Sequence, residues 1–279
     1  MSSKKSIYIK KADGELELFS SKKLANSLRR AGASETLVQE VITNIESWIV
    51  DGVTTKKIYG RAFSILRKKE RSRAARYSLK KAIMELGPTG YPFENFMGKL
   101  FEAQGYNVEV GKVLNGKCVT HEVDVIATKE KEQHFVECKY YNSQGKYASV
   151  RVPLYIRSRV NDIIDAKRIE GFDDYEFFGW IATNTRFTED AMNYGLCSGL
   201  KLISWDFPKE NSIKKIVEEN NLFPLTTLTE LTKSQKEQFL AKGVVMCKEL
   251  YDDSALFSLI SIKGKQISRV KKEIADLLE

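Results

Sequence analysis

The spacing of apolar residues changes along the chain. "SIYIKKADGELELF" (residues 6–19) alternates around Asp13-Gly14, which is typical of a β-hairpin. From there to residue 86, apolar residues recur three or four positions apart, which predicts helices. Ser20 or Ser21 is a suitable N-cap for the first helix, and Gly32 suits its C-terminal end. We therefore expect a mostly helical N-terminal third.

The Gly- and Pro-rich stretch "GPTGYP" (residues 87–92) breaks any helix and predicts a domain boundary. An amphipathic helix follows at 93–106. The expected order after it is strands at 107–113, 122–127 and 134–141, a basic helix-like stretch at 149–170 interrupted by Pro153, a strand at 175–183, a helix from Glu189 and a strand at 200–204. This order predicts an α/β fold with a mixed sheet flanked by helices.

After "WDFPKE" (residues 205–210) the pattern is helical again and indicates two helical hairpins, joined through Gly243 and Gly264. We therefore expect three domains, at residues 1–88, 89–208 and 209–279.

Composition narrows the class of protein. The chain has 279 residues, of which 42% are hydrophobic, and no apolar run approaches the roughly 18 residues of a membrane span. The N-terminus has no apolar segment typical of a secretory signal. The four cysteines are scattered and only two histidines occur, which argues against zinc clusters and multi-histidine metal sites. We expect a cytoplasmic protein with no membrane partner.

The net charge of +8 is unevenly distributed. Residues 1–88 carry 19 Lys and Arg against 9 Asp and Glu, whereas the remaining residues carry 26 against 28. The run "RKKERSRAAR" alone has six basic residues in ten. This asymmetry indicates a polyanionic partner, either nucleic acid or the phosphates of a nucleotide, and a solvated basic helix face is the alternative.

Two predicted strands carry charged side chains among apolar neighbours: Asp124 in "HEVDVIA", and Glu137 and Lys139 in "FVECKYY". Burying such charges is costly unless a partner compensates them. If the strands pair as a hairpin, Asp124 faces Glu137, and two carboxylates suit Mg²⁺, with Mn²⁺ as an alternative. Lys139 beside them suits metal-assisted phosphodiester hydrolysis. An exposed hairpin face with a cross-strand Glu–Lys pair is the alternative.

These motifs, with "FENFMGKLFEAQGY" before them and "ATNTRFTEDA" after them, resemble the Mrr-like branch of the PD-(D/E)xK nucleases over about residues 89–206. That family includes type IV restriction endonucleases and relatives of Holliday-junction resolvases. The resemblance implies that Asp124 and Glu137 bind the metal and that Lys139 is the catalytic lysine. It also implies that Glu94 on the preceding helix supports the site, with Glu102 as a less suitable substitute. Glu137 stands where many members have glutamine, which favours metal binding.

The following basic stretch carries Arg151, Arg157 and Arg159, which are candidates for contacts to DNA phosphates. A solvated helix face is an equally good interpretation of each one.

"YIKKADGELELFSSKKLANSLRRAG" resembles the opening of the ATP-cone domain, and the resemblance covers about residues 5–86. It implies that Lys10, Lys11 and Lys23 lie near the phosphates of ATP or a related nucleotide. No Walker A stretch occurs in the sequence, so we expect nucleotide binding without hydrolysis. The alternative is that the same basic residues bind DNA and no nucleotide.

The C-terminal helices faintly resemble helix-hairpin-helix units, in which Lys263, Gly264 and Lys265 would contact the DNA backbone. A helical packing or dimerisation module is the alternative. Together the segments predict a restriction- or defence-type, Mg²⁺-dependent DNA endonuclease that responds to a nucleotide. Cutting two strands needs two active sites, so we expect a homodimer or higher homo-oligomer. The alternatives are a non-catalytic, nucleotide-sensing DNA-binding regulator and a Holliday-junction resolvase-like enzyme.

Overall fold

The computed structural model describes residues 6–11, 14–143 and 145–278, which belong to two compact units. The N-terminal unit comprises residues 1–81, 227–232 and 262–279, and the sheet unit comprises residues 82–226 and 233–261. The C-terminal residues are therefore divided between both units, because the last helix packs on a helix of the N-terminal unit. The division into three domains stays a prediction.

The N-terminal unit begins with the expected β-hairpin. Strands β1 (Tyr8–Lys10) and β2 (Leu16–Leu18) pair antiparallel, and Gly14 between them has φ +95°. Ala12 and Asp13 of the expected Asp13-Gly14 turn lie outside the described residues.

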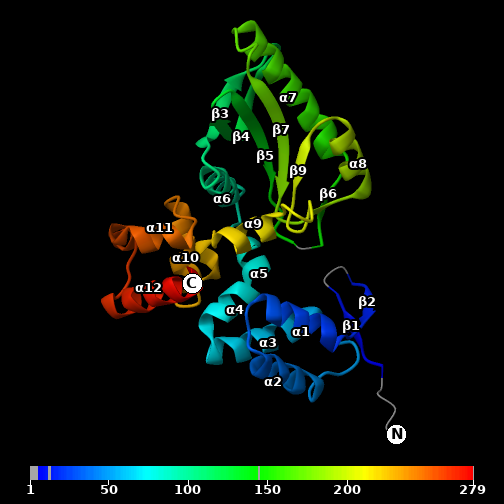
Figure 1. Cartoon of the computed structure of the whole chain (residues 1–279), viewed down its shortest axis with the longest axis vertical. Coiled ribbons are helices and arrows are strands. Elements are labelled where there is room, and N and C mark those ends of the chain that lie inside the picture. The colour runs from blue at the N-terminus through cyan, green and yellow to red at the C-terminus, as the bar shows by residue number, and fades with distance from the viewer. Residues whose placement is uncertain (1–5, 12–13, 144, 279) are drawn as a thin grey trace. The chain divides into compact units, whose positions relative to one another are not determined.

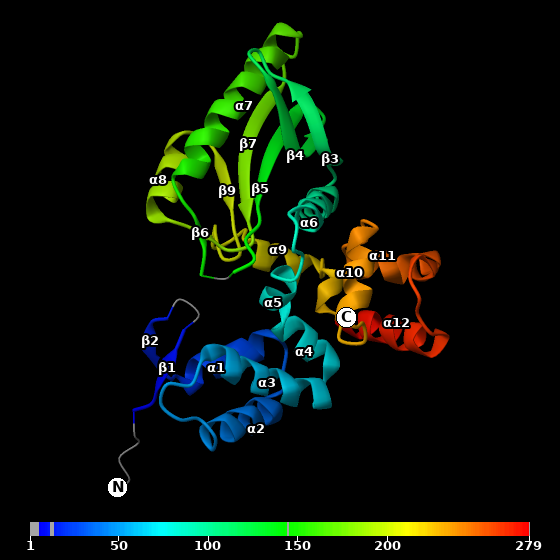
Figure 2. The same ribbon diagram turned by 180° about the vertical axis from the view of Figure 1, so that it is seen from behind.

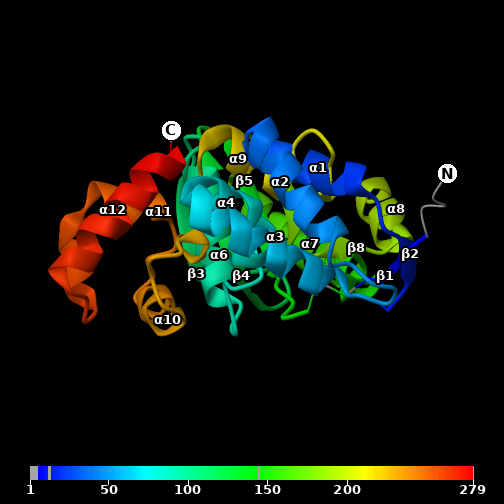
Figure 3. The ribbon, with the colours of Figure 1, turned by 90° about the horizontal axis from the view of Figure 1, so that it is seen from below.

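Four helices of this unit follow in sequence, and the last helix of the chain joins them: α1 (Ser21–Arg30), α2 (Glu35–Glu46), α3 (Thr55–Lys69), α4 (Arg71–Tyr77) and α12 (Gly264–Leu278). Ser20 caps α1 by accepting a hydrogen bond from the Lys23 amide at 3.2 Å, and Gly32 follows the helix with φ +81°. Apolar faces of α1, α2 and α3 share one core around Leu28, Val41 and Leu66. The helices of this core are seen together in Figure 3.

The sheet unit is built on a five-stranded mixed sheet, as the sequence predicts. Its order is β3-β4-β5-β7-β9, with β3 (Asn107–Asn115), β4 (Thr120–Lys129) and β5 (Glu132–Lys139) antiparallel, and β5, β7 (Glu176–Thr183) and β9 (Lys201–Ile203) parallel (Figure 1). Two further short strands, β6 (Tyr147–Ala148) and β8 (Arg186–Phe187), pair with each other.

Helices cover both faces of this sheet (Figure 2). Neighbouring residues of a strand point to opposite faces of the sheet, so His134 and Phe135 of β5 show which helix covers each face. His134 contacts the ring of Phe101 on α6 (Tyr91–Glu102), whereas Phe135 packs with Ile156 on α7 (Arg151–Ile169). Helix α8 (Glu189–Cys197) packs beside α7. Pro153 lies in the first turn of α7, where its ring is tolerated, so the expected interruption of this helix is wrong.

The remaining elements are α5 (Leu79–Ile83), α9 (Ile213–Asn220), α10 (Lys233–Ala241), α11 (Cys247–Asp252) and two 3₁₀ helices, η1 (Leu225–Thr227) and η2 (Ser254–Leu259). Gly243 follows α10 with φ +81°, as a helix-ending glycine does. The prediction of a second helical hairpin is wrong for the segment before Gly264, which forms the 3₁₀ helix η2 and not an α-helix. Among the described residues, no helix combines the length and the apolar character needed to span a bilayer.

Candidate active site

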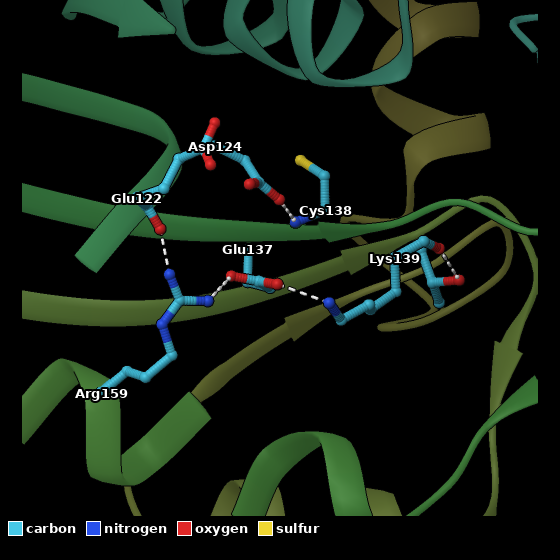
Figure 4. Close-up of polar contacts among 7 residues, drawn as sticks. Glu122, Asp124, Glu137, Cys138, Lys139 and Arg159 are labelled. Atoms are coloured by element: carbon cyan, nitrogen blue, oxygen red, sulfur yellow. Dashed lines mark hydrogen bonds and ion pairs between the residues drawn. The ribbon is translucent and has the colours of Figure 1, made fainter. Parts of the chain in front are cut away.

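Asp124 stands where strand β4 leaves regular pairing with both of its neighbours. On one side the pairing with β3 lapses at Gly111, the residue opposite Asp124, which has φ +63°. On the other side the pairing with β5 ends at Val125 and Val136, one residue short of Asp124. The amide of Cys138 is therefore free to donate a hydrogen bond to Asp124 Oδ2, at 2.7 Å (Figure 4). The break in pairing therefore leaves room for this half-buried carboxylate beside the β5 backbone.

Glu137 lies one step beyond that break and is held by two cations. The paired register of β4 and β5 ends at Val125 and Val136, so the predicted facing of Asp124 and Glu137 stays a prediction. Lys139, two residues along the strand, approaches Glu137 Oε1 at 2.5 Å, and Arg159 of α7 donates to Glu137 Oε2 at 2.6 Å. Arg159 also donates to the backbone carbonyl of Glu122 (Figure 4). The Glu137 side chain is 10% exposed, so these partners compensate a nearly buried charge.

Glu94, in the first turn of α6, lies within the electrostatic influence of these residues. Burial, together with the negative charges of Asp124, Glu122 and Glu137, raises the pKa of Glu94 to about 7. Burial and the Glu137 charge raise the pKa of Asp124 to about 6, although the Cys138 amide opposes the shift. Burial is the main cause of both shifts, and repulsion between neighbouring carboxylates adds to it.

Two other residues near the site have shifted pKa values. Burial raises the pKa of the Cys138 thiol well above its usual range, which agrees with a core side chain without a reactive role. Burial lowers the pKa of Lys139, but its hydrogen bond and ion pair with Glu137 outweigh burial and raise it overall. Lys139 is therefore cationic at neutral pH.

The structure brings Asp124, Glu137, Lys139 and Glu94 together, and it places Glu102 elsewhere. Glu102 is exposed and pairs with Lys99 on its own helix, at 2.9 Å. Within the part of the chain that the structure describes, no group of three or more His, Cys, Asp or Glu side chains is arranged so that it could hold a metal ion.

Two of the three basic residues predicted for the nucleotide, Lys11 and Lys23, converge on one acidic side chain. Lys11 approaches Glu17 at 3.2 Å and Glu15 at 3.3 Å, and Lys23 pairs with Glu17 as well. Lys10 is exposed on β1, and its amide bonds to the carbonyl of Val53. Glu17 was not predicted from the sequence, although its position two residues before Phe19 on the second strand of the hairpin puts it near both lysines.

Arg159 has a different position from the one the sequence suggests. It was a candidate for DNA contacts, yet it is turned inward to Glu137 and Glu122. Arg151 is exposed at the start of α7, and Arg157 is half-buried. The sequence offers one signal for this inward position. Arg159 stands one residue before the buried Val160, on the edge of the apolar face of α7.

Three protein families match successive parts of the chain. Residues 7–83 match the ATP cone domain, residues 87–206 match the restriction endonuclease family of the Mrr catalytic type, and residues 223–278 match the family described as AF1548-like, C-terminal. The chain thus joins an ATP-cone domain to a restriction-endonuclease domain with an α/β fold, as the sequence predicts.

An uncharacterized protein of Archaeoglobus fulgidus (strain ATCC 49558) is 30% identical over 154 residues, which cover 55% of this chain and 83% of the relative. The chain belongs to the same family as this archaeal protein. A crystal structure of AF1548, a protein of unknown function, is similar with a TM-score of 0.55 and 27% identity, over 68% of this chain and 98% of that one. The MspJI restriction endonuclease, solved with a 27-mer oligonucleotide, matches with a TM-score of 0.32 and 12% identity, over 84% of this chain and 48% of that one.

Proposed function

We propose that the chain is a divalent-metal-dependent DNA endonuclease of the restriction type, and that a nucleotide bound by its ATP-cone domain controls its activity. The observation that carries the proposal is the convergence of Asp124, Glu137, Lys139 and Glu94 at the break in β4. The match of the surrounding residues to a restriction endonuclease family supports it.

The residues suit a hard divalent cation such as Mg²⁺ or Mn²⁺. Oxygen ligands from carboxylates are what these ions prefer, and Asp124 and Glu137 would hold the ion. A bound cation would offset both the burial and the mutual repulsion that raise the pKa values of Asp124 and Glu94. In the arrangement described here Glu137 bonds to Lys139 and Arg159, so these two cations occupy the place of a metal on its carboxylate. When bound, the ion supplies Lewis acidity and activation of water.

The protein's own groups would act on the phosphodiester as follows. The Lys139 ammonium lies at the open edge of the site, with a side chain that is 34% exposed, and would stabilise the negative charge that develops on phosphorus-bound oxygens. Arg159 would keep Glu137 oriented through its bond to Oε2. Glu94, whose pKa is about 7, is able to hold or release a proton near neutral pH.

The ATP-cone domain would bind ATP or a related nucleotide near Lys10, Lys11 and Lys23. A triphosphate needs clustered cations, and Lys11 and Lys23 already meet at Glu17. Phosphate binding would have to displace Glu17 from these lysines, and the released hairpin would carry the signal. We further propose a cytoplasmic enzyme that acts as a homodimer or higher homo-oligomer, because cutting both strands needs two sites.

Cleavage of supercoiled plasmid tests the proposal. Wild type and Lys139→Ala would be compared in Mg²⁺, in Mn²⁺ and in EDTA, each with and without ATP, on methylated and unmethylated DNA and on a four-way junction. We expect cleavage that needs the metal and Lys139, and that ATP changes. Cutting of the junction alone would favour a resolvase-like enzyme, and the absence of all cleavage would contradict a nuclease.

A further inference from the structure

A strongly basic cleft lies in the N-terminal unit, at the bend between α3 and α4. Its volume is about 550 Å³, and α12 forms its opposite wall. Seven basic side chains line it, five from residues 67–73 and two from α12 (Arg269 and Lys272). Three acidic side chains also line it: Glu70, Glu273 and Asp276. The first seven residues of the run "RKKERSRAAR" therefore line the cleft, and the proposed active site does not use their charge.

The acidic residues of this region are engaged in holding the cleft together. Glu273 is buried, and its carboxylate accepts hydrogen bonds from the amide and hydroxyl of Thr229, both at 2.7 Å, and from the Glu230 amide at 2.9 Å. Glu230 is thereby placed between two arginines, where it pairs with Arg71 and, at 3.3 Å, with Arg269. These contacts fix the loop 227–232 and α12 to the bend, so the cleft is a built feature of the unit.

Three cations of the cleft remain available. Arg67, Lys68 and Lys272 are exposed, and no acidic side chain among the described residues forms an ion pair with any of them. Lys69 and Arg73, in contrast, have acidic neighbours at 3.5 Å and 3.8 Å. Unpaired cations on two different helices, facing one hollow, are suited to an extended polyanion.

The lining also indicates which part of a polyanion would bind. Every described residue that lines the cleft is charged or is a serine, and none is aromatic or apolar. A pocket for a nucleotide base normally offers an apolar or aromatic surface, and a single-strand binding groove offers rings on which bases stack. This cleft has no aromatic ring, and its apolar surface comes only from the stems of charged side chains, so its chemistry matches a sugar–phosphate backbone without its bases.

We infer that this cleft binds the phosphodiester backbone of duplex DNA, independently of sequence, as a second DNA-binding site remote from the nuclease residues in sequence. Lys10, Lys11 and Lys23 do not line it, and within this unit Figures 1 and 2 show the β1–β2 hairpin at one end and α12 at the other. The inference rests on the proposed action on DNA, but it does not require that the chain cleaves DNA.

Fluorescence anisotropy of a labelled 30-base-pair duplex tests this inference. The full chain would be measured in EDTA, so that no cleavage occurs, at several salt concentrations. Lys68→Glu and Lys272→Glu would be compared with Arg30→Glu, which makes the same change of charge on α1, where Arg30 bonds only to a carbonyl of its own helix. We expect each cleft variant to lose about five- to tenfold in affinity for any duplex sequence, and the slope of log K against log salt to fall by about one. Arg30→Glu should change neither.

Two results would overturn the inference. In one, Lys68→Glu and Lys272→Glu bind duplex as wild type does. In the other, the variants keep their DNA affinity but lose heat of binding on titration with ATP, which would make the cleft a site for a free nucleotide. If a glutamate variant fails to fold by circular dichroism, Lys68→Gln with Lys272→Gln would replace it. Because cleavage is not measured, failure of the endonuclease proposal and failure of this inference are distinguishable.

Discussion

Arg159 of α7 donates a hydrogen bond from Nη1 to Glu137 Oε2 at 2.6 Å, across the layer between the helix and the sheet. The same guanidinium bonds to the carbonyl of Glu122 on the neighbouring strand. One arginine thus ties together a predicted metal ligand, the strand before Asp124 and the helix that covers them. The Arg159 side chain is 15% exposed, so water compensates little if this contact is lost.

Replacing Arg159 should therefore weaken the metal-free protein and strengthen its response to metal. In EDTA, Arg159→Met should lower the free energy of unfolding by about 1–3 kcal/mol, because it leaves Glu137 nearly buried with Lys139 as its remaining ion partner. Mg²⁺ should then raise the melting temperature of the variant more than that of wild type, since Glu137 has lost a competing cation. Thermal unfolding with and without Mg²⁺ measures both effects.

Arg157→Met on the same helix is the matched control for that experiment. Arg157 forms no ion pair among the described residues, so its replacement should leave the response to Mg²⁺ unchanged. An Arg159→Met protein with the wild-type melting temperature in EDTA would show that the contact with Glu137 contributes nothing to stability.

The charge on Asp124 should destabilise the metal-free fold at neutral pH. Its pKa is raised to about 6 from 3.8, so the folded state holds this proton more tightly than the unfolded state does. The protonated Asp124 therefore contributes its full share to the stability of the fold below about pH 4. This contribution is lost as the pH rises through about 6. At pH 8 in EDTA, Asp124→Asn should be more stable than wild type by about 1 kcal/mol, because the amide oxygen still accepts from Cys138.

Urea unfolding at pH 8 and at pH 4 measures this difference, which should shrink at the lower pH. Glu109→Gln serves as the control, because Glu109 is exposed on β3 and its nearest cation is Lys112 at 3.8 Å. If Asp124→Asn is less stable than wild type at pH 8, the protein's own groups already stabilise the negative charge of Asp124 without a metal.

Patterns among residues close in sequence were sufficient to predict the helices and strands. The contacts that position the side chains of the site join residues far apart in sequence. The alternation around Asp124 and the spacing of Glu137 and Lys139 were sufficient to predict one hairpin with three charges on it. The order of strands and helices was sufficient to predict a mixed sheet. These features depend on residues close in sequence, because apolar residues repeat every two positions in a strand and about every 3.6 positions in a helix.

Contacts between distant residues had no such local signal. His121 bonds to Asp162 at 2.8 Å, and this carboxylate also accepts from the Cys118 amide at 2.9 Å, so it fixes the turn between β3 and β4 onto α7. The contact joins residues 41 positions apart. Arg159 and Glu137, and Glu273 and Thr229, are similar cases. In each pair the charged residue on the helix (Asp162, Arg159 or Glu273) does not look unusual in the sequence, because such residues are normally solvated.

Gly111 should matter for both stability and the position of Asp124. Its φ of +63° is a conformation that alanine adopts only at a cost of about 1–2 kcal/mol, although an added Cβ would meet no atom within 4 Å. Gly111→Ala should therefore lower stability by that amount. Since Gly111 stands opposite Asp124, the variant should also lose Mg²⁺-dependent cleavage.

Gly60→Ala provides the control for Gly111→Ala, because Gly60 lies inside α3 and its added Cβ also meets no atom within 4 Å. There the substitution should raise stability by up to about 1 kcal/mol, since alanine favours the helix. Chemical denaturation of both variants compares them directly. A Gly111→Ala protein as stable as wild type would show that the lapse in pairing does not depend on this glycine.

The buried carboxylate of Glu273 should be the main anchor of the C-terminal helix on the N-terminal unit. It accepts three hydrogen bonds from Thr229 and Glu230, and it is 4% exposed. Glu273→Ala removes these acceptors from two amides and a hydroxyl, which should lower the free energy of unfolding by about 2–4 kcal/mol. Asp276→Ala, three residues further on the exposed side of α12, should change it by less than about 0.5 kcal/mol. Hydrogen exchange of α12 and the loop 227–232 would locate the loss, and unchanged protection in Glu273→Ala would contradict the anchoring role.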